Sequence, residues 1–142
     1  MAFQFTPLSL HDVVLILPTR HRDDRGFFSE TFRASAFEPY VRDPFVQDNL
    51  ARSAAGVLRG LHFQLAPRAQ GKLIQVVRGE IWDVAVDIRR SSPTFRRWLV
   101  LRSDLTSGLL RQKTPSSRKR TGHCRCFPRR RRSSSKTVRT SS

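Results

Sequence analysis

The chain has 142 residues, 38% of them hydrophobic, and a formal net charge of +16. Its length suits one domain with a real hydrophobic core and excludes two comfortable ones. The charge lies mostly at one end, because residues 1–101 hold 14 Lys and Arg against 10 Asp and Glu, whereas residues 102–142 hold 13 against 1. The front segment therefore has the composition of an ordinary globular domain.

The first predicted elements are short strands separated by turn residues. An apolar run at Val13–Leu17 stops at Pro18, as a buried strand would. Asp23–Gly26 has turn chemistry and leads into Phe27–Phe32, which is rich in residues that favour strands. Arg33–Tyr40 is predicted to form a helical turn.

Further strands are predicted at Phe45–Leu50, Gly56–Phe63, Lys72–Arg78, Gly79–Ile88 and Phe95–Leu101. In Gly79–Ile88 the residues alternate between an apolar face that carries Trp82 and a mixed face that carries Asp83 and Asp87. No long segment shows a helical apolar stripe. The pattern predicts an all-β protein, an antiparallel jelly roll or related barrel.

This pattern stops at residue 101, so we take residues 1–101 as the N-terminal part of a jelly-roll domain. Residues 102–142 are rich in Arg and Ser, offer little to bury, and are predicted to form a disordered basic tail. We hypothesise that the reading frame slips between Leu101 and Gln112, which sequencing of the encoding DNA would test. A jelly roll that is incomplete in this way is expected to expose sheet edges and part of its apolar interior.

Other features of the sequence indicate where the protein works. No stretch approaches the length of a transmembrane span, and the Met1–Phe5 start lacks the pattern of a leader. Both cysteines, Cys124 and Cys126, lie in the tail and are too close together for an ordinary disulfide. We expect a soluble cytoplasmic protein with no membrane association.

His62 is the best single candidate for a catalytic base, because imidazole titrates near neutral pH. Taken alone, however, a histidine on a strand is more often a hydrogen-bonded structural residue than a catalytic one. Lys72 and Arg59 are by themselves ordinary strand residues. Asp83 and Asp87 are by themselves typical of a solvated strand face.

The sequence around these residues resembles the dTDP-4-dehydrorhamnose 3,5-epimerases, the RmlC-like branch of the cupin-type jelly rolls. The resemblance covers residues 1 to about 101. Six motifs carry it in order: Asp24–Glu30, Phe45–Asn49, Val57–Gln64, Ala69–Leu73, Gly79–Asp87 and Ser92–Phe95.

The resemblance implies epimerisation of a dTDP-linked 4-keto-6-deoxyhexose at the carbons beside the ketone, in dTDP-rhamnose biosynthesis. It implies that His62 is the base and that Lys72 stabilises the enolate, with Asp83 supporting the imidazole. The residues that match substrate-binding positions are Arg25, Glu30, Gln47, Asp48, Asn49 and Arg59. It also implies a homodimer, and chemistry that needs neither a cofactor nor a metal.

The resemblance does not continue beyond about residue 101. The family continues into strands with a second active-site histidine and a catalytic tyrosine, whereas the one tyrosine here is Tyr40. A sibling 5-epimerase or ketoisomerase shares the histidine base and stays open as an alternative. So does a polyanion binder that uses the tail, including Arg129–Arg132, for non-specific, salt-dependent contact with nucleic acid.

Overall fold

The computed structural model describes residues 2–41, 43–105, 108–113 and 134–141. The strands within these residues are β1 (Phe3–Pro7), β2 (Val14–Pro18), β3 (Arg20–Asp23), β4 (Gly26–Ser29), β5 (Phe45–Ser53), β6 (Gly71–Arg78), β7 (Glu80–Val86), β8 (Trp98–Asp104), β9 (Leu109–Lys113) and β10 (Ser134–Ser141). A short helix, α1 (Ala34–Phe37), lies between β4 and β5. No helix in the described part of the chain is long and apolar enough to cross a membrane.

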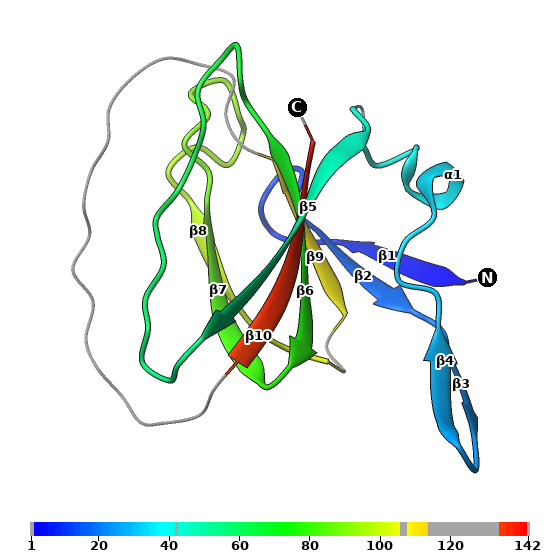
Figure 1. Cartoon of the computed structure of the whole chain (residues 1–142). Helices are drawn as coiled ribbons and strands as arrows, with labels where there is room; N and C mark the ends of the chain where they lie inside the picture. The colour runs from blue at the N-terminus through cyan, green and yellow to red at the C-terminus, as the bar shows by residue number, and fades with distance from the viewer. Residues whose placement is uncertain (1, 42, 106–107, 114–133, 142) are drawn as a thin grey trace.

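The strands form three antiparallel groups (Figure 1). A six-stranded sheet has the order β1-β2-β9-β6-β10-β5, and β7 pairs with β8 in a second sheet. β3 and β4 form a hairpin that projects away from both sheets (Figure 1). The predicted all-β antiparallel class is confirmed.

Two apolar clusters lie on opposite faces of the six-stranded sheet. In the first cluster, Ile16 and Leu73 pack with Phe3 and Phe37, so that α1 covers this face. In the second cluster, Ile74 of β6 packs with Ala85 of β7. The second cluster therefore joins the six-stranded sheet to the β7–β8 sheet.

The strand β7 turns its carboxylate-bearing face inward. Ala85 and Asp87 on this face are buried, whereas Trp82, Val84 and Val86 on the opposite face are exposed. The expectation of a solvated strand face is therefore wrong for Asp87, which is 5% exposed. The burial is possible because other polar groups satisfy the carboxylate, as described below.

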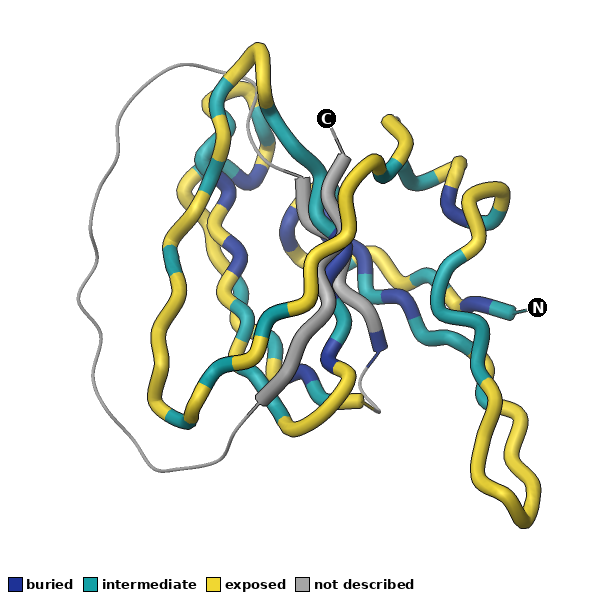
Figure 2. The backbone as a smooth tube through the Cα atoms, in the orientation of Figure 1, coloured by how far each residue is buried: buried dark blue, intermediate teal, exposed yellow. Residues whose placement is uncertain are grey.

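The predicted strand at Gly56–Phe63 is not formed, since residues 54–70 carry no strand in this structure. Gly60 has a φ of 140°, a backbone conformation that side chains other than glycine rarely adopt. Figure 2 shows that much of this connection is exposed. Alternating residues favour a strand, but a strand also needs a neighbour with which to pair.

Two segments of the predicted disordered tail are strands of the six-stranded sheet. β9 pairs with β2 and β6, and β10 pairs with β5 and β6. Gly108, just before β9, fits closely on β2, because a Cβ there would lie 2.5 Å from the carbonyl oxygen of Ile16. Composition pointed to disorder because it ignores such non-local pairing. Residues 114–133, with Arg129–Arg132, lie outside the described residues.

Candidate functional site

The register of the six-stranded sheet places three predicted site residues on one face. Gln47 of β5 and Lys72 of β6 both pair with position 140 of β10, so they lie in one cross-strand row. Paired residues of neighbouring strands point to the same side of a sheet. Asn49, two residues after Gln47, shares this side because side chains alternate along a strand.

This face of the sheet is the one that meets β7 and β8. Ile74 lies two residues after Lys72 on the same face of β6, and it packs with Ala85 of β7. Asp83 lies two residues before Ala85, on the same face of β7. Lys72 and Asp83 therefore lie on the two faces that oppose each other, and both are partly buried.

Side chains alternate between the two faces of the sheet along β5, and this places Asp48 on a different face from its two neighbours. The Gln47 side-chain amide donates a hydrogen bond to Oδ1 of Asn49, with 3.1 Å between the two atoms. Asp48 lies between them in sequence and therefore on the opposite face of the sheet. The structure thus brings Gln47 and Asn49 together and does not bring Asp48 to them.

Arg59 and His62 lie on the connection between β5 and β6. Arg59 is anchored to the end of β5, because its Nε donates to Oγ of Ser53 at 2.9 Å and its guanidinium also donates to the carbonyl of Arg52 at 3.2 Å. His62 is exposed. The positive φ of Gly60 changes the direction of the backbone between the two residues.

Arg25 and Glu30 lie at and just beyond the β3–β4 hairpin. Arg25, in the turn, pairs with Asp23 at 2.6 Å, and this hydrogen bonding lowers the pKa of Asp23. Both Glu30 carboxylate oxygens accept from Arg33 at 2.9 Å. The hairpin extends away from the sheet face that carries Lys72 (Figure 1), so the structure does not bring Arg25 to it.

The predicted site residues thus fall into three groups: a face with Gln47, Asn49 and Lys72 opposite Asp83, a connection with Arg59 and His62, and the hairpin. Among the described residues no cluster of His, Cys, Asp and Glu could hold a metal ion. Tyr40 lies in the first apolar cluster, stacked on Phe5 with 4.1 Å between ring centroids. It is therefore part of the core.

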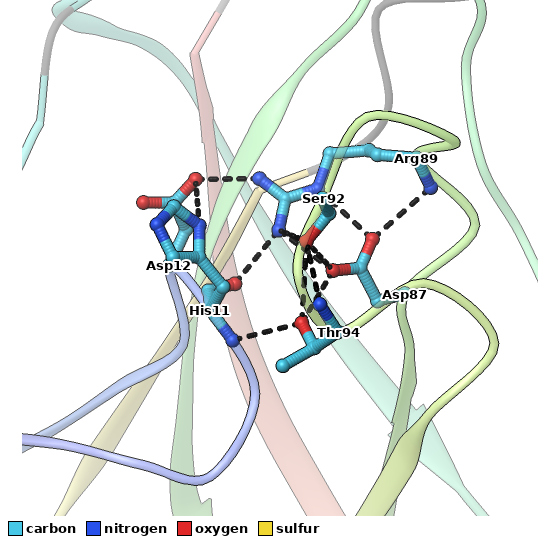
Figure 3. Close-up of polar contacts among 6 residues, drawn as sticks. All are labelled: His11, Asp12, Asp87, Arg89, Ser92 and Thr94. Atoms are coloured by element: carbon cyan, nitrogen blue, oxygen red, sulfur yellow. Dashed lines mark hydrogen bonds and ion pairs between the residues drawn. The ribbon is translucent and has the colours of Figure 1, made fainter.

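A dense cluster of polar side chains around Asp87 and Arg89, drawn in Figure 3, was not predicted from the sequence. Arg89, just after β7, bonds the carboxylate of Asp87 at 2.9 Å and that of Asp12 at 2.5 Å. Its guanidinium also donates to the carbonyl of His11 at 2.8 Å. The oxygen Oδ2 of Asp87 further accepts from Ser92 and Thr94 at 2.5 and 2.7 Å.

This cluster ties the β7–β8 connection to the turn between β1 and β2. Burial alone would raise the pKa of Asp87, but hydrogen bonds from Arg89, Ser92 and Thr94 outweigh it and hold that pKa well below the ordinary range. The hydrogen bond to Asp87 in turn raises the pKa of Arg89. Because the charged groups satisfy one another, we assign the cluster a structural role. The signal in the sequence was an aspartate on the mixed face of the predicted strand, followed by an arginine two residues later.

Comparison with known proteins places this arrangement in a family. A family model described as dTDP-4-dehydrorhamnose 3,5-epimerase matches residues 7–107. The chain belongs to this family. The epimerase of Shigella flexneri is 56% identical over 90 residues, which are 62% of this chain and 50% of that protein. The epimerase of Pseudomonas aeruginosa is 54% identical over 96 residues, 66% of this chain and 52% of that protein.

Solved structures of epimerases share the fold. The dTDP-6-deoxy-D-glucose-3,5-epimerase of Legionella pneumophila, in complex with dTDP-4-keto-L-rhamnose, matches with a TM-score of 0.80 and 33% identity, over 98% of this chain and 71% of that chain. This confirms the predicted cupin-type jelly roll. The chain spans about half the length of the curated epimerases it matches.

The Asp87–Arg89 pair gives a prediction for stability. Replacing Asp87 with Asn leaves Arg89, whose side chain is 14% exposed, without its main counter-charge. Breaking a largely buried pair in this way costs about 3–5 kcal/mol. We therefore expect the urea midpoint of unfolding to fall for D87N. The control Asp43→Asn, at an exposed position, should change the free energy of unfolding by no more than about 0.5 kcal/mol. Equal midpoints for the two variants would remove the structural role of the cluster.

The same carboxylate gives a prediction for acid sensitivity. Because the folded pKa of Asp87 is depressed, its stabilisation is complete above the ordinary carboxyl pKa of about 4 and is lost as the pH falls below it. The difference in unfolding free energy between the wild-type chain and D87N should therefore shrink steadily below about pH 4. A difference that stays constant down to pH 2 would contradict this assignment.

Proposed function

We propose that this chain carries the proton-transfer site of a dTDP-4-dehydrorhamnose 3,5-epimerase. The reaction converts dTDP-4-dehydro-6-deoxy-D-glucose into dTDP-4-dehydro-L-rhamnose, and we place it in dTDP-rhamnose biosynthesis in the cytoplasm. The observation that carries the proposal is the row of Gln47 and Lys72, with Asn49, on the inner face of a sheet with the family's fold.

The chemistry requires no group beyond amino-acid side chains. His62 removes the proton from a carbon beside the 4-keto group, and the electron pair of that C–H bond moves onto the carbonyl oxygen to give an enolate. The positive charge of Lys72 stabilises this oxygen. A proton then returns to the same carbon from the opposite side, which inverts it.

The step that returns the proton limits how far this chain alone can carry the epimerisation. The family's catalytic tyrosine has no counterpart in residues 1–101, since Tyr40 stacks on Phe5 in the core. We therefore expect the chain to exchange the proton next to the ketone with water far more readily than it completes the inversion. A sibling 5-epimerase shares this exchange step but acts on C5 alone.

We also propose that the substrate is held by Gln47 and Asn49, with Arg59 and Arg25 for its diphosphate, in a homodimer. A planar guanidinium suits phosphate oxygens because it donates two parallel hydrogen bonds. The hairpin with Arg25 extends away from the Lys72 face of its own copy (Figure 1), and a second copy offers a hairpin that could approach it. Glu30 lies beside the hairpin, so it would approach the Lys72 face of the other copy together with Arg25.

The test of the proposed function is deuterium uptake from heavy water into dTDP-4-dehydro-6-deoxy-D-glucose. General-base catalysis contributes about 10²–10⁴-fold, so His62→Ala should slow uptake by at least 100-fold. His21→Ala, which removes an exposed histidine on the hairpin, is the matched control and should leave the rate unchanged. Label at both C3 and C5 distinguishes the 3,5-epimerase from a 5-epimerase.

Exchange that survives His62→Ala would remove this histidine as the base. Absence of exchange from folded wild-type chain, with intact binding of dTDP, would remove the catalytic proposal and leave a nucleotide-binding protein. Circular dichroism of each variant checks that the fold is kept.

The alternation along β5 gives a separate prediction for binding. Asn49→Ala removes a side chain from the inner face, and it should weaken dTDP binding by several-fold because one charge-assisted or neutral hydrogen bond is worth about 0.5–3 kcal/mol. Asp48→Ala acts on the outer face and should leave the affinity unchanged. Isothermal titration calorimetry compares them, and a larger loss for Asp48→Ala would show that β5 presents its other face to the ligand.

A further inference from the structure

Ser53, at the end of β5, lies on the same face of the six-stranded sheet as two predicted site residues of that strand. The pairing of β5 with β10 is regular from Gln47 to Ser53, so side chains alternate without interruption between these two positions. Gln47, Asn49 and Ser53 all occupy odd positions of the strand, and Ser53 is partly buried. The Ser53 hydroxyl therefore belongs to the inner face, on which Gln47, Asn49 and Lys72 lie.

The Ser53 hydroxyl also holds Arg59 at this face. The connection that follows β5 reverses its direction in a turn, in which the Val57 amide donates to the carbonyl of Ala54 at 3.4 Å. Gly56 in this turn has a φ of 79°, which favours glycine. After the turn, Nε of Arg59 donates to Oγ of Ser53 at 2.9 Å. This hydrogen bond joins the connection to the inner face.

The guanidinium of Arg59 is held by one edge of its planar group. Nε binds Ser53, and Nη2 donates to the carbonyl of Arg52 at 3.2 Å. A guanidinium has five N–H donors in a fixed fork, so these two bonds do not occupy the end that carries Nη1. Within the part of the chain that the structure describes, Nη1 forms no hydrogen bond, and Arg59 is exposed. This end of the guanidinium can therefore donate to a ligand.

An anchored arginine binds an anion better than a mobile one. The arginine side chain has many rotamers, and a ligand that must order it loses part of the binding free energy to the entropy of that ordering. The hydrogen bonds to Ser53 and Arg52 order the guanidinium of Arg59 before a ligand binds. The end of a guanidinium presents two parallel N–H groups, which match two oxygen atoms of a phosphate.

We propose that Ser53 is a positioning residue, which holds Arg59 so that the Nη1 end of its guanidinium binds the diphosphate of the nucleotide sugar. Ser53 does not need to touch the ligand, because it acts through Arg59. The inference rests on the proposed function, in which Arg59 binds the diphosphate. It adds to the site a residue that the motifs of the sequence did not assign to it.

The first test compares dTDP with thymidine, by isothermal titration calorimetry, on the wild-type chain and on Ser53→Ala. Removal of the hydroxyl releases Arg59, so we expect dTDP to bind about 3- to 10-fold more weakly, which is the effect of ordering one long side chain. Thymidine lacks the diphosphate and should bind with unchanged affinity. Ser9→Ala, which removes an exposed hydroxyl between β1 and β2, is the matched control and should change neither affinity.

Two further variants separate a positioning role from a structural one. Ser53→Thr keeps the hydroxyl on a residue that suits a strand, and it should restore the affinity for dTDP to within about 2-fold of the wild type. Arg59→Ala removes the group that Ser53 positions, so adding Ser53→Ala to it should cause no further loss. A loss of the same size in both backgrounds, or a Ser53→Thr variant as weak as Ser53→Ala, would overturn the proposal.

The second test observes the anchor without a ligand. The Nε–H group of Arg59 gives a signal in the proton–nitrogen NMR spectrum, which Arg59→Lys identifies by its loss. A hydrogen bond slows the exchange of this proton with water, so we expect its protection to be lost in Ser53→Ala and regained in Ser53→Thr. Equally fast exchange in the wild type and in Ser53→Ala would show that Ser53 does not hold Arg59.

The two tests together separate failure of this proposal from failure of the proposed function. A wild-type chain that binds no dTDP, but protects Arg59 in a way that depends on Ser53, supports the anchor and contradicts the proposed function. Binding of dTDP that Arg59→Ala weakens and Ser53→Ala leaves unchanged supports the proposed function and overturns the role of Ser53. Circular dichroism checks that each variant is measured in its folded state.

Discussion

The guanidinium of Arg89 holds the two sheets of this protein in their relative position. It binds Asp87 at the end of β7 and Asp12 in the turn between β1 and β2, so it joins the second sheet to an edge of the first. The apolar contact of Ile74 with Ala85 provides burial, but apolar contacts are non-directional. The charged hydrogen bonds have a preferred geometry, so they orient one sheet relative to the other. The opposition of Lys72 and Asp83 across the two sheets depends on this joint.

Much of the fold could be predicted from the sequence where the signal was local. Three predicted strands correspond to strands of the structure: Val13–Leu17, Phe45–Leu50 and Lys72–Arg78. In each of them an apolar or alternating run of residues was enough to indicate a strand. Residues 56–63 carried the same kind of signal and form no strand, because pairing depends on a neighbour elsewhere in the chain. The strands β9 and β10 were missed for the opposite reason: their pairing is non-local, while their composition is that of a tail.

The candidate site was predictable in residue type but less so in arrangement. The motifs named Gln47, Asp48 and Asn49 as one group, whereas the alternation of β5 divides them between two faces. Lys72 joins Gln47 through the register with β10, which no inspection of either strand alone could reveal. The role of Arg89 was missed because its partner Asp12 is distant in the sequence. Whether His62 acts as the base stays a prediction.

The position of β10 bears on how the chain folds. This strand lies between β5 and β6, yet its partners on β5 are separated from it by 81 to 96 residues of sequence. Loop-closure entropy opposes such contacts, and proteins dominated by them fold slowly. Until β10 is in place, β5 has no neighbour in the sheet, since β10 is its only pairing partner among the described strands. During synthesis, β5 would therefore remain unpaired until β10 has been made, and an unpaired strand edge is prone to aggregation.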